Sequence, residues 1–141
     1  MTRTVAPDGE VRLTAGTCTF TYKRARPGAL LVTIAGHDTG QFGTTTLDEI
    51  RLEILRHRPL DLFVDAREAL APAMNVSTEW TRFFSMNRDQ LRQVGILVRS
   101  KIVELTIAIA QHLSHTGQLI KIYSDPAVFR ERVEKEPGKR L

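Results

Sequence analysis

The alternation of apolar and polar residues predicts strands in the first third of the chain. In TCTFTY, Cys18, Phe20 and Tyr22 alternate with threonines, which is the period of a strand with one buried face. The stretch 29–36, ALLVTIAG, is almost wholly apolar, as expected of a strand in the interior of a sheet. The turn residues of RPG, at 26–28, lie between the two and predict a hairpin.

A helical pattern follows over residues 47–58. Its apolar stripe consists of Leu47, Ile50, Ile54 and Leu55. Thr46 and Glu49 have the spacing of a capping box, which would satisfy free amide groups at the start of this helix. The apolar run 60–66, LDLFVDA, then predicts a buried strand. Because a strand–helix–strand unit forms a right-handed crossover, we expect the strands over 29–36 and 60–66 to be parallel.

The second half of the chain continues the same alternation. A helix is predicted from near Ser77, which would act as its N-cap, to the end of EWTRFFSMNRDQLRQ at residue 93. Its buried side would consist of Trp80, Phe83, Phe84 and Leu91. A strand over 95–100, a helix over 101–117 and a strand over 119–124 come next. Asp125 as N-cap and Pro126 at the first helical position predict a final helix.

This order of elements predicts one α/β domain. We expect a mixed, mostly parallel sheet with an N-terminal hairpin and four α-helices, over residues 15–135. Residues 1–14 are polar and contain Pro7, Asp8 and Gly9, so we expect a flexible N-terminal arm. Residues 136–141 are expected to form a flexible tail.

The composition agrees with a globular domain and disfavours some classes of function. The chain has 141 residues, of which 42% are hydrophobic and 26% charged, with a net charge of +4. The basic residues are scattered, so a solvated surface is favoured over nucleic-acid binding. Cys18 is the only cysteine, which excludes an intramolecular disulfide and favours a buried side chain. There is no signal-peptide pattern and no transmembrane segment, so we expect a cytoplasmic protein.

The strands LVTIAG, LFVDAR, GILVR and LIKIYSD, in this order, resemble those of the STAS superfamily, the fold of bacterial anti-sigma-factor antagonists. The SpoIIAA-like branch is the most similar, and the resemblance covers roughly residues 16–135. It implies a STAS-like fold and a non-enzymatic signalling domain that acts through protein–protein contacts. Some STAS domains also bind nucleotides or lipids.

The resemblance also implies a candidate regulatory site. In the antagonists, a strand that ends in aspartate leads to an Asp-Ser-Ser-Gly-like motif whose serine caps a helix and is phosphorylated. Asp65 matches the aspartate, and Ser77 and Thr78 hold an approximately equivalent position without that motif. The two hydroxyls are therefore either helix-capping groups or a phosphosite. Arg67 offers Asp65 a local salt bridge in the strand-end loop.

The sequence predicts no catalytic residues, no metal site and no cofactor. The histidines, His37, His57, His112 and His115, have no cysteine or carboxylate arrangement typical of a metal centre. A His37–Asp38 couple precedes Thr44–Thr46, but no nucleophile-elbow motif accompanies it. The loop GQFGTTT lacks the lysine of a phosphate-binding loop.

The helix over 101–117 carries two apolar stripes, which is one more than packing on a sheet requires. The second stripe, Val103, Ile107 and Ala110, is predicted to form an interface with a second copy of the chain or with an unidentified protein partner. A regulatory domain that self-associates is therefore the first functional prediction. The alternatives are a module that binds a lipid or nucleotide between loops 37–45 and 65–76, and a phospho-switch antagonist that uses Ser77 or Thr78.

Overall fold

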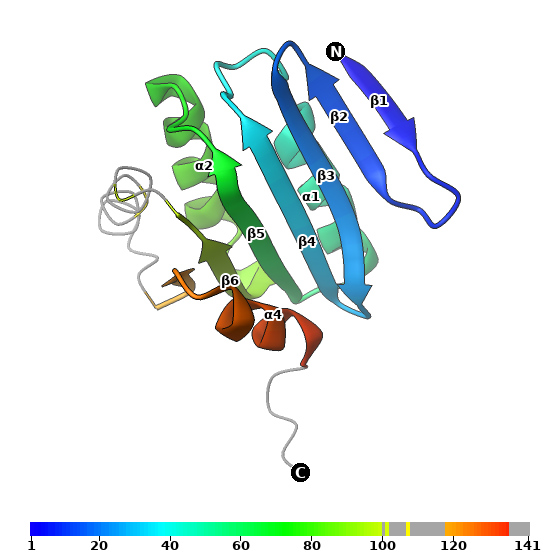
Figure 1. Cartoon of the computed structure of the whole chain (residues 1–141). Coiled ribbons are helices and arrows are strands. Elements are labelled where there is room, and N and C mark those ends of the chain that lie inside the picture. The colour runs from blue at the N-terminus through cyan, green and yellow to red at the C-terminus, as the bar shows by residue number, and fades with distance from the viewer. Residues whose placement is uncertain (100, 102–106, 108–117, 136–141) are drawn as a thin grey trace.

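The computed structural model describes residues 1–99, 101, 107 and 118–135 of the chain. A seven-stranded sheet forms its centre, with the strands side by side in their chain order, from β1 to β7 (Figure 1). The strands are β1 (Thr2–Val5), β2 (Val11–Ala15), β3 (Cys18–Arg26), β4 (Ala29–Gly36), β5 (Leu60–Ala69), β6 (Leu91–Leu97) and β7 (Ile120–Tyr123). The helices are α1 (Thr45–Arg56), α2 (Met74–Met86) and α4 (Pro126–Glu134), with a 3₁₀ turn η1 (Arg88–Gln90).

Strand directions divide the sheet into two halves. Each pair of neighbours from β1 to β4 is antiparallel, whereas the pairs β4–β5, β5–β6 and β6–β7 are parallel. The predicted hairpin between β3 and β4 is confirmed, and Gly28 occupies its turn with a φ of +79°, which a residue with a Cβ rarely adopts. The predicted parallel crossover from β4 through α1 to β5 is also confirmed.

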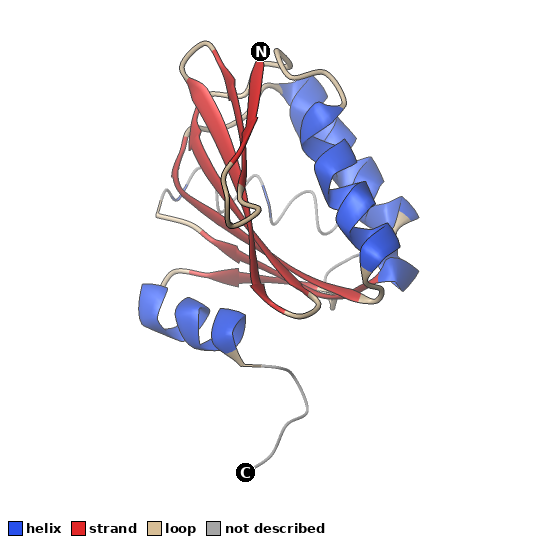
Figure 2. Cartoon of the chain, turned by 90° about the vertical axis from the view of Figure 1, so that its right-hand side faces the viewer, coloured by secondary structure: helices blue, strands red, loops and turns tan. Residues whose placement is uncertain are grey.

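Helices cover both faces of the sheet (Figure 2). α1 and α2 pack on one face, where Ile50, Phe83 and their neighbours join inward residues of β2 to β6 in the main core. α4 packs on the other face, where Phe129 and Val133 join a smaller cluster that includes Phe63. The predicted cap of α4 is confirmed, because the Asp125 carboxylate accepts a hydrogen bond from the amide of Ala127 at 2.9 Å.

The prediction of a flexible arm over residues 1–14 is wrong, because this segment contains β1 and most of β2. Val11 and Leu13 alternate with polar residues and lie opposite Tyr22 and Phe20 of β3. This alternation of apolar and polar residues has the same period of two as that of β3, so it indicates a strand. The prediction of a flexible arm gave more weight to the polar composition of the surrounding residues. The predicted tail, 136–141, lies outside the described residues.

The structure describes three α-helices rather than four, because the predicted helix over 101–117 falls largely outside the described residues. α1 begins at Thr45, and Thr46 is buried while Glu49 pairs with Arg3, so the predicted capping box does not form. The predicted apolar stripe also placed Leu55 on the buried side of α1, but 69% of the surface of this residue is exposed.

α2 begins and ends earlier than predicted. It starts at Met74 after Ala73, so Ser77 lies inside the helix and is not its N-cap. It ends at Met86, and Leu91 lies in β6 rather than on the helix. Leu91 is buried as predicted, but the sheet buries it. An apolar residue at helical spacing can equally begin a buried strand, and here pairing with β5 decides the outcome.

Candidate functional site at the β5–α2 connection

Asp65 lies inside β5 rather than at its end. Its two carboxylate oxygens accept hydrogen bonds from Nε and Nη2 of Arg67 at 3.0 and 2.8 Å, so the predicted local salt bridge is present. Burial opposes ionisation of Asp65, but its hydrogen bonds with Arg67 outweigh that effect and lower its pKa below the ordinary value. Asp65 is therefore a charged group held by a partner two residues away.

The connection between β5 and α2 is short and fixed at both ends. The amide of Leu70 donates to the carbonyl of Gly36 at 3.0 Å, and that of Ala73 donates to the carbonyl of Asp38 at 3.1 Å. Two large apolar side chains nevertheless point to solvent here, since Leu70 is 62% exposed and Met74 is 85% exposed. The connection therefore displays apolar side chains at a fixed place.

Ser77 and Thr78 occupy different environments within the first turns of α2. Thr78 is exposed, and its hydroxyl donates to the carbonyl of Met74 at 2.9 Å. Ser77 is half-buried and faces a cavity beneath the helix. Of the two predicted phosphosites, Thr78 is the more exposed to solvent.

The cavity lies between α2 and the sheet and has a volume of about 130 Å³. Its wall is almost entirely apolar, with a few polar groups in Asp38, Ser77 and Thr81. Ile107, the one described member of the predicted interface stripe, lines this cavity and packs against the main core. Val103 and Ala110 lie outside the described residues, so the interface itself stays a prediction.

Asp38 is a buried carboxylate, 7% exposed, on the wall of the cavity. Its Oδ1 accepts a hydrogen bond from the amide of Gly40 at 3.0 Å. Burial raises the pKa of Asp38, and the Gly40 amide and the positive potential of His37 offset only part of that rise. A second cavity of about 250 Å³, with a more polar wall that includes Arg51 and Glu79, shares Asp38 with the first.

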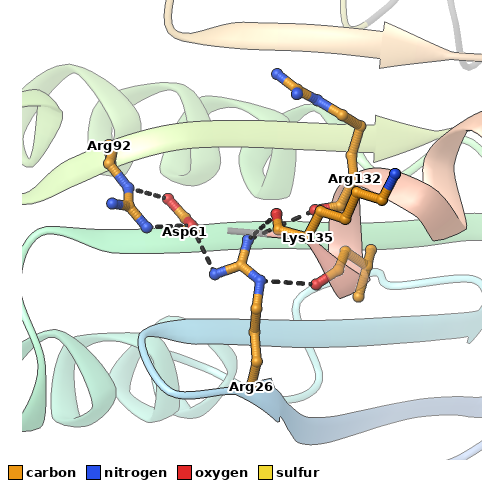
Figure 3. Close-up of polar contacts among 6 residues, drawn as sticks. Arg26, Asp61, Arg92, Arg132 and Lys135 are labelled. Atoms are coloured by element: carbon orange, nitrogen blue, oxygen red, sulfur yellow. Dashed lines mark hydrogen bonds and ion pairs between the residues drawn. The ribbon is translucent and has the colours of Figure 1, made fainter. Parts of the chain in front are cut away.

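A buried ion cluster near the start of β5 was not predicted from the sequence (Figure 3). Asp61 is completely buried, and Nε and Nη2 of Arg92 bind its oxygens at 2.8 and 2.6 Å. Nη1 of Arg26 lies 2.9 Å from the same carboxylate. Arg26 also donates to the carbonyls of Val133 and Lys135, both at 3.0 Å, at the end of α4. An aspartate within an apolar strand was the only sequence signal for this cluster.

The remaining titratable side chains form no candidate metal site within the part of the chain that the structure describes. No group of three or more His, Cys, Asp or Glu side chains converges there as metal ligands would. His37 and His57 are exposed, and His112 and His115 lie outside that part. Cys18 is fully buried, as predicted, and burial raises the pKa of its thiol to about 11. Among the described helices, none has the length and apolar composition that crossing a bilayer requires.

Comparison with solved structures identifies the fold. An uncharacterized protein of the DUF3478 family with a SpoIIAA-like fold, from Shewanella loihica PV-4, superimposes with a TM-score of 0.59 at 13% identity, covering 86% of this chain and 98% of that one. An anti-sigma factor antagonist from Mycobacterium paratuberculosis superimposes with a TM-score of 0.56, also at 13% identity, covering 94% of this chain and 100% of that one. No protein-family model matches the sequence. No curated protein matches it either. The fold is therefore SpoIIAA-like, as the STAS resemblance predicted.

Proposed function

We propose that this chain is a non-enzymatic, SpoIIAA-like regulatory domain that acts through protein–protein contacts at the β5–α2 connection. The observation that carries the proposal is the exposure of Leu70 and Met74 on a backbone that is hydrogen-bonded in place. Large apolar side chains that are exposed to water on a fixed backbone mark a candidate contact site. The structural likeness to an anti-sigma factor antagonist supports a protein as the partner.

The charged groups near this connection support a binding role rather than a catalytic one. Asp65 is held by Arg67, and the buried Asp38 carboxylate accepts a hydrogen bond from the Gly40 amide. Glu68 pairs with Arg99 at 2.9 Å on the same edge of the sheet. Each of these carboxylates thus has a structural partner, which leaves none of them as a free acid or base near the connection.

The test is site-specific photo-crosslinking in the cells that produce the protein. A photoreactive residue replaces Met74 in one variant and Met86 in a matched control, since Met86 is also an exposed methionine of α2, at 77% exposure. We expect a protein adduct from position 74 and none from position 86. Equal adducts at both positions, or none at position 74, would contradict the proposed contact surface.

A phospho-switch remains an extension of this proposal, and Thr78 is the residue that would carry it. Thr78 is exposed one turn from Met74, so a phosphate there would add negative charge at the edge of the proposed surface. We expect Thr78→Asp to weaken the crosslink from position 74, whereas Ser77→Asp would instead place a charge toward the cavity. An unchanged crosslink in Thr78→Asp would rule out a repulsive switch at this residue.

Self-association through the predicted stripe of Val103, Ile107 and Ala110 is a separate proposal, and Val103 is the position to test because Ile107 packs against the main core. We expect Val103→Asp to convert an oligomer to a monomer, because a carboxylate in an apolar interface loses its hydration without gaining a partner. Native mass spectrometry at several concentrations measures this. A folded variant that keeps the oligomeric mass would contradict the proposed stripe.

A further inference from the structure

The cavity beneath α2 is an unusual feature for the main core of a domain. Protein interiors normally pack densely, with few voids larger than a water molecule. This one has a volume of about 130 Å³ and is bounded by side chains from both the sheet and α2. Its apolar wall includes Phe20, Ile34, Val64, Trp80, Phe84 and Ile96. A void of this kind weakens packing, so a molecule that fills it would stabilise the folded chain.

The volume and polarity of the cavity define the size and chemistry of an occupant. An apolar cavity of about 150 Å³ inside a protein stays dry and accepts benzene. A space of about 130 Å³ is therefore suited to one aromatic ring or a short branched hydrocarbon group. Water is a poor occupant, because it needs several polar partners and nearly the whole wall is apolar.

The charges of the wall exclude an anionic occupant. Among the described residues that line the cavity there is no lysine, arginine or histidine. The one ionisable lining group is Asp38, whose carboxylate would repel a phosphate or another carboxylate. Nucleotides are therefore disfavoured, and an uncharged molecule is favoured.

The cavity borders the surface of the protein at the β5–α2 connection. Leu70 and Pro72 line it, although 62% of Leu70 is exposed to solvent. The same side chain thus belongs to both the cavity wall and the outer surface. The cavity therefore meets the surface at an apolar side chain.

We propose that this cavity is a binding site for a compact, apolar, uncharged molecule, or for the uncharged end of a hydrocarbon chain, that enters beneath the β5–α2 connection. The sequence left open whether a small ligand would be a lipid or a nucleotide, and this site favours an apolar ligand. It does not depend on the protein-contact function, because binding in the cavity and crosslinking at position 74 are measured separately.

Nuclear magnetic resonance titration of the full chain tests the proposal, with benzene as the ring probe and 1-octanol as the chain probe. Saturable shifts at the Trp80 indole with at least one probe are the expected result. Shifts with benzene alone would assign the site to a ring, and shifts with 1-octanol would assign it to a chain. Octanoate is the matched anion, and we expect its shifts to be much weaker than those of 1-octanol. Octanoate shifts as strong as those of 1-octanol would overturn the exclusion of anions.

Two adjacent residues of α2 provide matched variants. Ser77→Leu places a large side chain in the cavity, whereas Thr78→Leu adds a leucine at the neighbouring exposed position. We expect the Trp80 shifts to disappear in Ser77→Leu and to persist in Thr78→Leu. If Ser77→Leu does not fold, Thr81→Leu fills the same cavity from the next turn. The proposal is overturned if wild-type chain gives no saturable shift, or if the filled and control variants bind alike.

Discussion

The two faces of the sheet are held together in different ways. On the face under α1 and α2, a large apolar core makes the contact, and a cavity of about 130 Å³ remains within it. On the face under α4, the apolar cluster is small, and Phe129 and Val133 are its only helical members among the described residues. There, Arg26 binds both the buried Asp61 and the last carbonyls of α4 (Figure 3).

The difference shows where directional bonds are needed and where they are not. Apolar burial is non-directional, so the large core can hold two helices and still tolerate a void. The short α4 buries little apolar surface, and charge-assisted hydrogen bonds fix its position. The candidate contact surface and the cavity both lie on the apolar side. We therefore expect changes on the α4 side to affect stability and changes on the α2 side to affect binding.

The largest predicted effect is on the ionic side. Asp61→Ala should lower the free energy of unfolding by about 3–5 kcal/mol, because it leaves two arginines near an emptied, buried position. Urea denaturation measures this loss. Glu68→Ala is the control, because its pair with Arg99 is exposed and should contribute at most about 1 kcal/mol. Similar losses in both variants would contradict the structural role of the buried cluster.

A smaller effect of opposite sign is predicted on the apolar side. Ser77→Leu should raise the free energy of unfolding by about 1 kcal/mol, since it adds buried methylene groups to existing space. Thr78→Leu should leave that free energy nearly unchanged, because its side chain stays in solvent. Thermal denaturation of the two variants makes the comparison. A loss of stability in Ser77→Leu alone would mean that the cavity cannot accept a side chain.

The smallest effect is on the pH dependence of stability, where Asp38 and Asp65 should act oppositely. Burial raises the pKa of Asp38, so its favourable contribution to folding exists below the ordinary pKa of 3.8 and is lost as pH rises through the folded value. Asp38→Asn should therefore gain stability relative to wild type as pH rises from acid to neutral. The hydrogen bonds from Arg67 lower the pKa of Asp65 despite its burial. Asp65→Asn should therefore lose stability relative to wild type as pH rises from acid to neutral. Denaturation at several pH values separates the two, and equal slopes would contradict this assignment.

Local sequence signals predicted the elements that depend on local interactions. The RPG hairpin and the Asp125 cap were both predicted correctly, because each is determined by residues within one turn. The start of α2 was not predictable in this way. It begins at Met74 without a side-chain cap, and the preceding Ala73 amide bonds to the carbonyl of Asp38, which is remote in the sequence.

The candidate site was only partly predictable for the same reason. The pairing of Asp65 with Arg67 follows from their spacing of two along a strand. The ion cluster instead joins Asp61 to Arg26 and Arg92, which belong to separate strands. The cavity depends on how far α2 lies from the sheet, a tertiary distance that no pattern in the helix specifies.

Native mass spectrometry of the protein isolated from its own cells tests the central claim most directly, with wild type, Met74→Asp and Met86→Asp compared under the same conditions. A contact surface at the β5–α2 connection predicts that wild type and Met86→Asp carry a bound protein partner and that Met74→Asp loses it while remaining folded. The same bound mass in all three proteins, or a bare chain in wild type, would contradict the account.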